Sequence, residues 1–138
     1  MERLQVRPLV LVLLVGLACA ACGGASRRGR TVTFLAGGNF PPSTIVGHYS
    51  ARGCTADTHT LVQDAALYYA HSTGLAGPAD LYYYNMRFAY AHFQADGCTS
   101  KELGHEMERR LTARQRTFLL HNVASNLQRA FRAALDGA

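Results

Sequence analysis

Apolar residues recur at helical spacing over most of the chain beyond residue 57. In the first such stretch they lie three or four residues apart, on one face of a helix, while Gln63 and Asp64 lie off that face. Asp57 or Thr58 is expected to cap this helix, which we predict to run to about Ser72. Its apolar face consists of Leu61, Val62, Ala65, Ala66 and Tyr69.

A second helix is predicted from Ala79 to about Ala95. Gly74 and Pro78 end the first helix before it, and Pro78 also suits the first turn of the new helix. Asp80 lies near the positive end of the helix dipole. Large apolar residues point in nearly every direction, so we expect this helix to be central, or to bury one face and offer another to a partner. They are Leu81, Tyr82, Tyr83, Tyr84, Met86, Phe88, Tyr90 and Phe93.

Two capping boxes indicate further helix starts. In each, a threonine is followed three residues later by Glu or Gln, at residues 99–102 and 112–115. The two helices that follow are either separate or continuous across residues 111–112, and Gly137 ends the second. The last helix has the cleanest apolar stripe: Leu120, Val123, Ala124, Leu127, Ala130, Phe131, Ala134 and Leu135. We therefore predict a mainly α fold, a small bundle of three or four helices.

Residues 31–53 do not follow the helical pattern. Residues 31–35 have strand-like composition, Pro41 and Pro42 forbid a helix, and residues 44–46 form another short apolar run. Because one strand cannot make a sheet, we predict an extended segment that packs on the helical body.

Cys54 precedes the first predicted helix, and Cys98 follows the second. Two helices joined by a short connection should lie antiparallel, which brings the start of the first beside the end of the second. We therefore predict a disulfide between Cys54 and Cys98 that staples the bundle. The closed loop of about 45 residues corresponds to roughly 4 kcal/mol of stability in the chain-entropy model.

The first residues have the three parts of a secretory signal peptide. Arg3 and Arg7 precede an uninterrupted apolar run at residues 9–17, and small residues follow at 18–24. The apolar run covers only positions 9–22 even when it is extended through Cys22. A membrane span needs about 20 apolar residues, so export is the better interpretation.

The segment 1–24 resembles the signal of bacterial lipoproteins, in which small residues precede a cysteine that is diacylated and becomes the new N-terminus. The resemblance implies lipidation of Cys22, although Cys19 stands where that pattern prefers leucine. Lipidation of Cys22 leaves Cys54 and Cys98 to pair, and we favour it for that reason. Lipidation of Cys19, or ordinary cleavage after Ala20, would leave an odd thiol in an oxidising compartment.

These boundaries divide the chain into four parts. They are a signal peptide (1–21), a lipid anchor with a flexible tether (22–30), an extended segment (31–53) and a helical domain (54–138). Gly23 follows the lipid site. In such lipoproteins an aspartate at this place usually blocks sorting to the outer membrane, and this chain has glycine there instead. The resemblance therefore implies the periplasmic face of the outer membrane, with a periplasmic or secreted protein as the alternative.

The remaining chemistry is sparse. The net charge is +5, but the basic residues are spread along the chain and no recognition module accompanies them, so we expect no nucleic-acid binding. His105 and Glu106 begin like the zinc motif H-E-x-x-H, but Arg109 occupies the place of the second histidine. We therefore predict no metal site, no cofactor and no catalytic residue.

Tyrosine clustering is the one compositional feature that suggests a binding role. Tyr83, Arg87 and Tyr90 are the candidate partner-binding residues, because tyrosines anchor interfaces well. The function we expect is a non-enzymatic envelope lipoprotein that binds another envelope protein as an accessory component of an envelope or secretion assembly. Two alternatives are a helical-repeat-like module for peptide or glycan, and a small periplasmic hydrolase using His105, Glu106 or His121.

Overall fold

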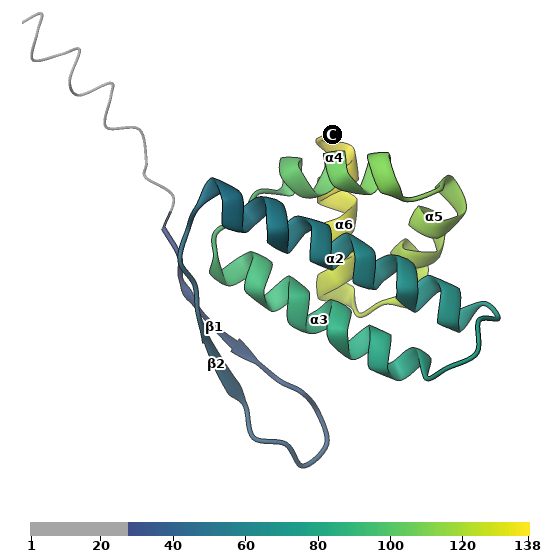
Figure 1. The fold of residues 1–138 in the computed structure, drawn as a ribbon, viewed down its shortest axis with the longest axis horizontal. Helices are drawn as coiled ribbons and strands as arrows, with labels where there is room; N and C mark the ends of the chain where they lie inside the picture. The colour runs from purple at the N-terminus through teal and green to yellow at the C-terminus, as the bar shows by residue number, and fades with distance from the viewer. Residues whose placement is uncertain (1–27) are drawn as a thin grey trace, which may run out of the picture.

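The computed structural model describes residues 28–138, and this part of the chain is mainly helical (Figure 1). The predicted helical bundle with one disulfide and an extended segment before it is confirmed, although the described residues form five helices instead of three or four. The elements, in chain order, are β1 (Thr31–Phe34), β2 (Ser43–Val46), α2 (Ala51–Ser72), α3 (Ala79–Ala95), α4 (Ser100–Arg110), α5 (Ala113–Asn122) and α6 (Ser125–Asp136).

The first helix begins earlier than expected. Ser50 caps α2, and its hydroxyl accepts a hydrogen bond of 2.9 Å from the amide of Gly53. The predicted start at Asp57 or Thr58 was therefore wrong, and Cys54 lies inside the first turn rather than before it. The apolar spacing missed this turn because its residues, from Ala51 to Gly53, include no large apolar side chain.

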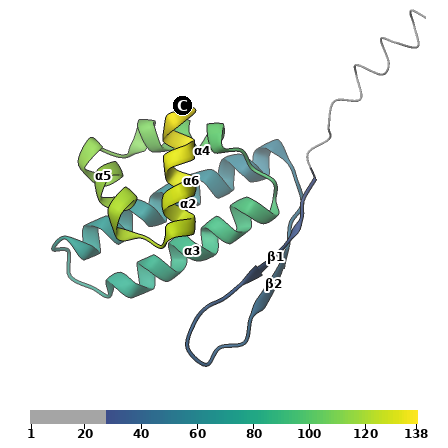
Figure 2. The ribbon, with the colours of Figure 1, turned by 180° about the vertical axis from the view of Figure 1, so that it is seen from behind.

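Helices α2 and α3 lie side by side and antiparallel, joined by a short connection at one end of the molecule (Figure 1). Figure 2 shows α6 crossing this pair, with α4 beside it and the short α5 closing one end. The expected capping boxes at Thr99 and Thr112 are both formed. They begin separate helices, α4 and α5, so the continuous alternative does not occur.

The stretch predicted as one last helix is two helices. The helix is interrupted at Val123 and Ala124, whose backbones are extended, so α5 ends at Asn122 and α6 begins at Ser125. Ala124 is exposed, although the helical stripe had placed it on the buried face. The break lets α6 turn back across the α2–α3 pair and place Leu127 in the core.

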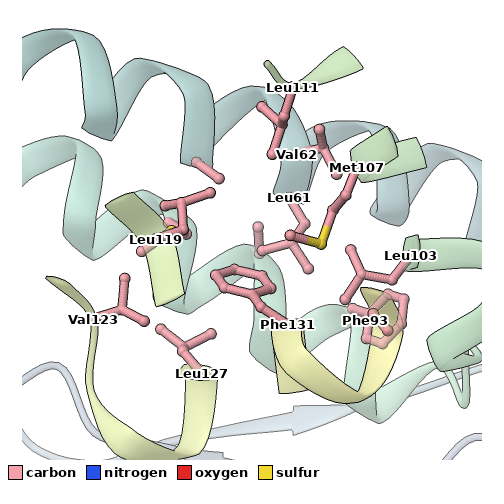
Figure 3. Packing of buried hydrophobic residues seen from close by; sticks show 14 residues of the cluster. Leu61, Val62, Phe93, Leu103, Met107, Leu111, Leu119, Val123, Leu127 and Phe131 are labelled. Carbon is pink, nitrogen blue, oxygen red and sulfur yellow. The ribbon is translucent and has the colours of Figure 1, made fainter. Parts of the chain in front are cut away.

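The main core lies where α6 meets the other helices. In Figure 3 the ring of Phe131 lies among Leu61, Leu119 and Leu127, and all four are almost fully buried. Helices α4 and α6 pack so closely that their backbones are in contact at Gly104. A Cβ atom at this position would lie 2.1 Å from the carbonyl oxygen of Ala134. Other fully buried side chains are Val62, Met86, Leu103 and Met107.

Residues 31–46 are extended and pack on the helical body as predicted, but they also pair with each other as an antiparallel β-hairpin, which the sequence did not predict. Thr31 pairs with Val46, and Phe34 pairs with Ser43. The two short runs were seen in the sequence, but the eight-residue connection between them lacks a short hairpin turn, so their pairing was missed. Phe34 and Ile45 point towards α3 and form a second, smaller buried cluster with Ala91 and Ala95.

Candidate binding surface

The disulfide predicted from the sequence lies at the junction of the hairpin, α2 and α3. The Cα atoms of Cys54 and Cys98 are 5.3 Å apart, and the bond joins the first turn of α2 to the residues after α3. The base of the hairpin packs on the same end of α3. A Cβ atom at Gly47 would lie 1.8 Å from the carbonyl oxygen of Ala95, so only glycine allows this approach.

Hydrogen bonds hold the base of the hairpin in place. The amide of Arg30 donates to the carbonyl of Ala95 at 2.7 Å, and the amide of His48 donates to the carboxylate of Asp96 at 2.8 Å. The carbonyl of Arg30 also accepts from the amide of Gly47 at 3.0 Å. Arg30, which the sequence assigned to the flexible tether, therefore belongs to the folded domain.

The inner face of the hairpin is fixed by aromatic contacts with α3. The ring of Phe34 makes edge-to-face contacts with Tyr84 and Phe88, with centroids 5.5 and 5.3 Å apart. The guanidinium of Arg87 lies 5.4 Å from the centroid of the same ring and donates a hydrogen bond to the carbonyl of Leu35. These contacts hold the hairpin at a fixed position on the helical body.

The three predicted partner-binding residues all make contacts within the domain. Arg87 holds the hairpin, and the hydroxyl of Tyr83 accepts a hydrogen bond of 2.8 Å from the amide of Ala124. Tyr90 is half-buried and accepts from the side-chain amide of Gln94 at 3.0 Å, and burial raises the pKa of its hydroxyl. Arg87 and Tyr90 line a cavity of about 190 Å³ between the hairpin, α3 and α6, whereas Tyr83 lies away from it.

A different face of α3 carries the exposed apolar side chains. Leu81, Tyr84 and Phe88 follow one another at helical spacing and have exposed fractions of 50%, 39% and 39%. We call these three residues the α3 stripe. The sequence showed apolar residues on all sides of this helix, but this pattern does not predict which face remains exposed.

The hairpin carries a second group of exposed apolar side chains. Phe40 in the connecting loop is 76% exposed, and Val46 and Leu35 are 62% and 59% exposed. We call these three residues the hairpin surface. Val46 follows Ile45, which is buried against α3, and successive side chains of a strand point to opposite faces. It therefore points away from the helices.

An acidic cleft of about 300 Å³ lies between α2 and α3, beside the α3 stripe. Asp57, Asp64, Asn85, Phe88 and His92 contribute to its walls, so Phe88 belongs to both features. Burial, a hydrogen bond with Asp96 and the negative charge of Asp96 together raise the pKa of Asp57 to about 7. Burial also raises the pKa of Asp64. Because both carboxyls ionise less readily than usual, a positive group that entered the cleft would gain from their ionisation.

The side chains considered for a hydrolase do not all meet. His105 and Glu106 line one pocket between α2 and α4, whereas His121 lies on α5 and contacts the carbonyl of Thr117 at 2.8 Å. Burial acts to raise the pKa of Glu106. Its hydrogen bonds and ion pairs with Arg109, His59 and Arg110 outweigh this and hold the pKa below its usual range.

Within residues 28–138, no group of three His, Cys, Asp or Glu side chains is arranged to hold a metal ion. No helix in this range is long and apolar enough to cross a membrane. The proposed lipidation sites, Cys22 and Cys19, lie outside the described residues. No protein-family model, curated protein or solved structure matches the chain.

Proposed function

We propose that the protein is a non-enzymatic lipoprotein of the bacterial cell envelope, anchored through Cys22, whose helical domain binds another envelope protein. The signal-like segment and the parity of the cysteines support the anchor. The periplasmic face of the outer membrane is the proposed location, since Gly23 follows the lipid site without an aspartate.

The observation that carries the binding role is the α3 stripe. The fold buries Phe131, Met86 and other large side chains almost completely, yet leaves Leu81, Tyr84 and Phe88 partly exposed in one row. Contiguous apolar surface of this kind is typical of protein interaction sites. Aromatic residues are also enriched at the centres of interfaces, where water is excluded.

The acidic cleft adds a second recognition element beside the stripe. Asp57 and Asp64 are partly desolvated carboxyls that line the same cleft as Phe88. An arginine or lysine of a partner would stabilise the ionised form of both carboxyls, and it would lie against the ring of Phe88. We therefore propose that the partner presents an apolar patch with a basic side chain at its edge.

Site-specific photo-crosslinking in the envelope tests this assignment. A photoreactive phenylalanine analogue at Phe88 is expected to give a discrete crosslinked species. The same analogue at Leu75, which is 56% exposed in the α2–α3 connection, serves as the matched control and should give none. Introducing Leu81→Asp into the Phe88 probe variant should reduce the crosslink about tenfold or more, because it places a charge in a desolvated interface.

Intact mass of the same membrane preparation tests the anchor separately. A diacylated chain that begins at Cys22 is the expected result, whereas an unmodified chain that begins at Ala21 would refute the anchor. Equal crosslinking from positions 88 and 75, or none from either, would refute binding through the α3 stripe whatever the mass shows.

A further inference from the structure

The β-hairpin belongs to the longest uncharged stretch of the domain. Residues 31–50 include no Asp, Glu, Lys or Arg, and His48 is the only histidine in this range. Basic residues flank the stretch on both sides: Arg28 and Arg30 precede it, and Arg52 follows. An uncharged projection with cationic flanks matches the chemistry of a membrane surface, where apolar groups lie beneath anionic headgroups.

The shape of the hairpin places its apolar side chains where a flat surface can reach them. In Figures 1 and 2 the loop between β1 and β2 projects clear of the helices. Phe40 lies in this loop and has the largest exposed fraction, 76%, of the large apolar side chains in the described residues. Pro41 and Pro42 follow it, and both are exposed.

We propose that the hairpin surface, led by Phe40, inserts into the interfacial layer of the bilayer to which the protein is anchored. This inference rests on the proposed lipoprotein function, since the anchor keeps the hairpin close to a membrane. It assigns the membrane to the hairpin and leaves the α3 stripe to the protein partner.

The length of the tether permits this contact. Five residues lie between Cys22 and Arg28, where the described chain begins, and the six steps from one Cα atom to the next span at most about 20 Å. The hairpin extends at most about 25 Å from Thr31 to the loop at Asn39, at the usual rise per strand residue. Because the two lengths are similar, the tether is long enough for the tip of the hairpin to reach the bilayer.

The chemistry of the loop limits how deep it can go. The loop residues between β1 and β2 lie outside the paired strands, and unpaired backbone groups are too costly in the hydrocarbon core. Phe40 is therefore expected to lie at the level of the headgroups and the first acyl carbons, with the exposed Arg28 as a cationic group for the phosphates. Val46 is close to the base of the hairpin, so it should lie shallower than Phe40.

Tryptophan fluorescence tests the proposal directly, because the chain has no tryptophan of its own. The Phe40→Trp variant of the lipidated full-length protein would be reconstituted in vesicles of phosphatidylethanolamine and phosphatidylglycerol. We expect a blue-shifted emission and a loss of intensity when the vesicles contain tail-brominated lipid. Leu75→Trp, an exposed site at the far end of α2 and α3, is the control and should show neither change. Val46→Trp should be quenched less than Phe40→Trp.

Two results would overturn the proposal. One is an emission from Phe40→Trp that stays water-like and insensitive to brominated lipid. The other is an emission from Phe40→Trp in native envelope vesicles that is protected from aqueous iodide yet not quenched by lipid, since a protein would then cover the hairpin. If intact mass shows no lipid at Cys22, the anchor fails, but titrating the same variant with vesicles still decides whether the hairpin binds lipid.

Discussion

Among the titratable side chains of residues 28–138, Asp57 has the largest shift in pKa. Its carboxyl lies on α2 beside the cleft, where burial and the neighbouring Asp96 raise its pKa to about 7. In the unfolded chain the same group has its ordinary pKa of 3.8. The folded domain therefore holds a proton at Asp57 that the unfolded chain has released between about pH 4 and pH 7.

The sign of this linkage gives a prediction for stability. A raised folded-state pKa stabilises the protein fully below the unfolded pKa, and this contribution is lost as the pH rises through about 7. Asp57→Asn removes this loss, so from pH 5 to pH 8 the variant should gain stability relative to the wild type. We expect about 1 kcal/mol, because Asp57 is only partly buried and solvent screens most of the shift.

Thermal or urea unfolding of both proteins across this pH range measures the difference. Asp136→Asn, which alters an exposed carboxyl at the end of α6, is the matched control and should run parallel to the wild type. If Asp57→Asn also ran parallel to the wild type, the proposed proton at Asp57 would be excluded.

Individual residues were predictable where local pattern alone placed them. Cys54 and Cys98 could be paired because two antiparallel helices bring their positions together, and this did not depend on the exact helix start. The exposed face of α3 could not be found in this way. Apolar side chains surround that helix, so only the packing of α2, α6 and the hairpin decides that Tyr83 and Tyr90 turn inward while Tyr84 stays partly exposed.

At the scale of elements, the helix starts marked by a capping box were easier to predict from the sequence than the interruption between α5 and α6. Thr99 and Thr112 carry capping boxes with a local signature, and both formed as expected. The break at Val123 and Ala124 has no such signature. Ala124 has no side chain that could cap α6, and the turn is favoured by the burial of Leu127 and Phe131 against other helices. Likewise, the hairpin depends on pairing across an eight-residue loop and on its contact with α3, neither of which is local.

The contact between α4 and α6 gives the prediction at this scale. Gly104→Ala would place a methyl group 2.1 Å from the carbonyl oxygen of Ala134, a distance at which the two helices must separate. The core between them includes Leu103 and Met107, so the shift would open tightly packed surface. We expect a loss of about 2–3 kcal/mol in the free energy of unfolding, although alanine favours helix more than glycine does.

Denaturant unfolding of Gly104→Ala measures this loss. Gly53→Ala provides a contrast on another helix, because a methyl group there meets only the side chain of Ser50. Moving that side chain aside costs no more than its capping hydrogen bond, about 1 kcal/mol. A stable Gly104→Ala protein, with a midpoint equal to or above that of the wild type, would contradict the close helix contact.

Considered as a whole, the molecule is organised around the end of the α2–α3 pair that carries the disulfide. Cys54 and Cys98 join the two helices there, and Arg30 and His48 attach the hairpin to the same end through Ala95 and Asp96. The junction fixes the base of the hairpin, and Phe34 of the hairpin in turn packs on Tyr84 and Phe88 of the α3 stripe. The disulfide therefore supports both proposed binding surfaces.

Loss of the disulfide should consequently affect both stability and the position of the hairpin. Replacing both cysteines, Cys54→Ala with Cys98→Ala, frees a loop of about 45 residues in the unfolded chain and should lower the free energy of unfolding by roughly 4 kcal/mol. For a domain of this size, that corresponds to a fall in melting temperature of roughly 15 °C or more.

Thermal unfolding with and without reductant provides the measurement, and the double variant is its own control, because reductant should no longer change its melting temperature. Hydrogen exchange then shows where stability is lost. The amides of Arg30 and Gly47, which bond at the base of the hairpin, should lose protection before those of the α4–α6 contact, since the junction lies nearer the missing bond. Unchanged melting on reduction would show that packing alone holds this end together. In that case, the packing of Phe34 and Gly47 on α3, and not the disulfide, would hold the hairpin in position.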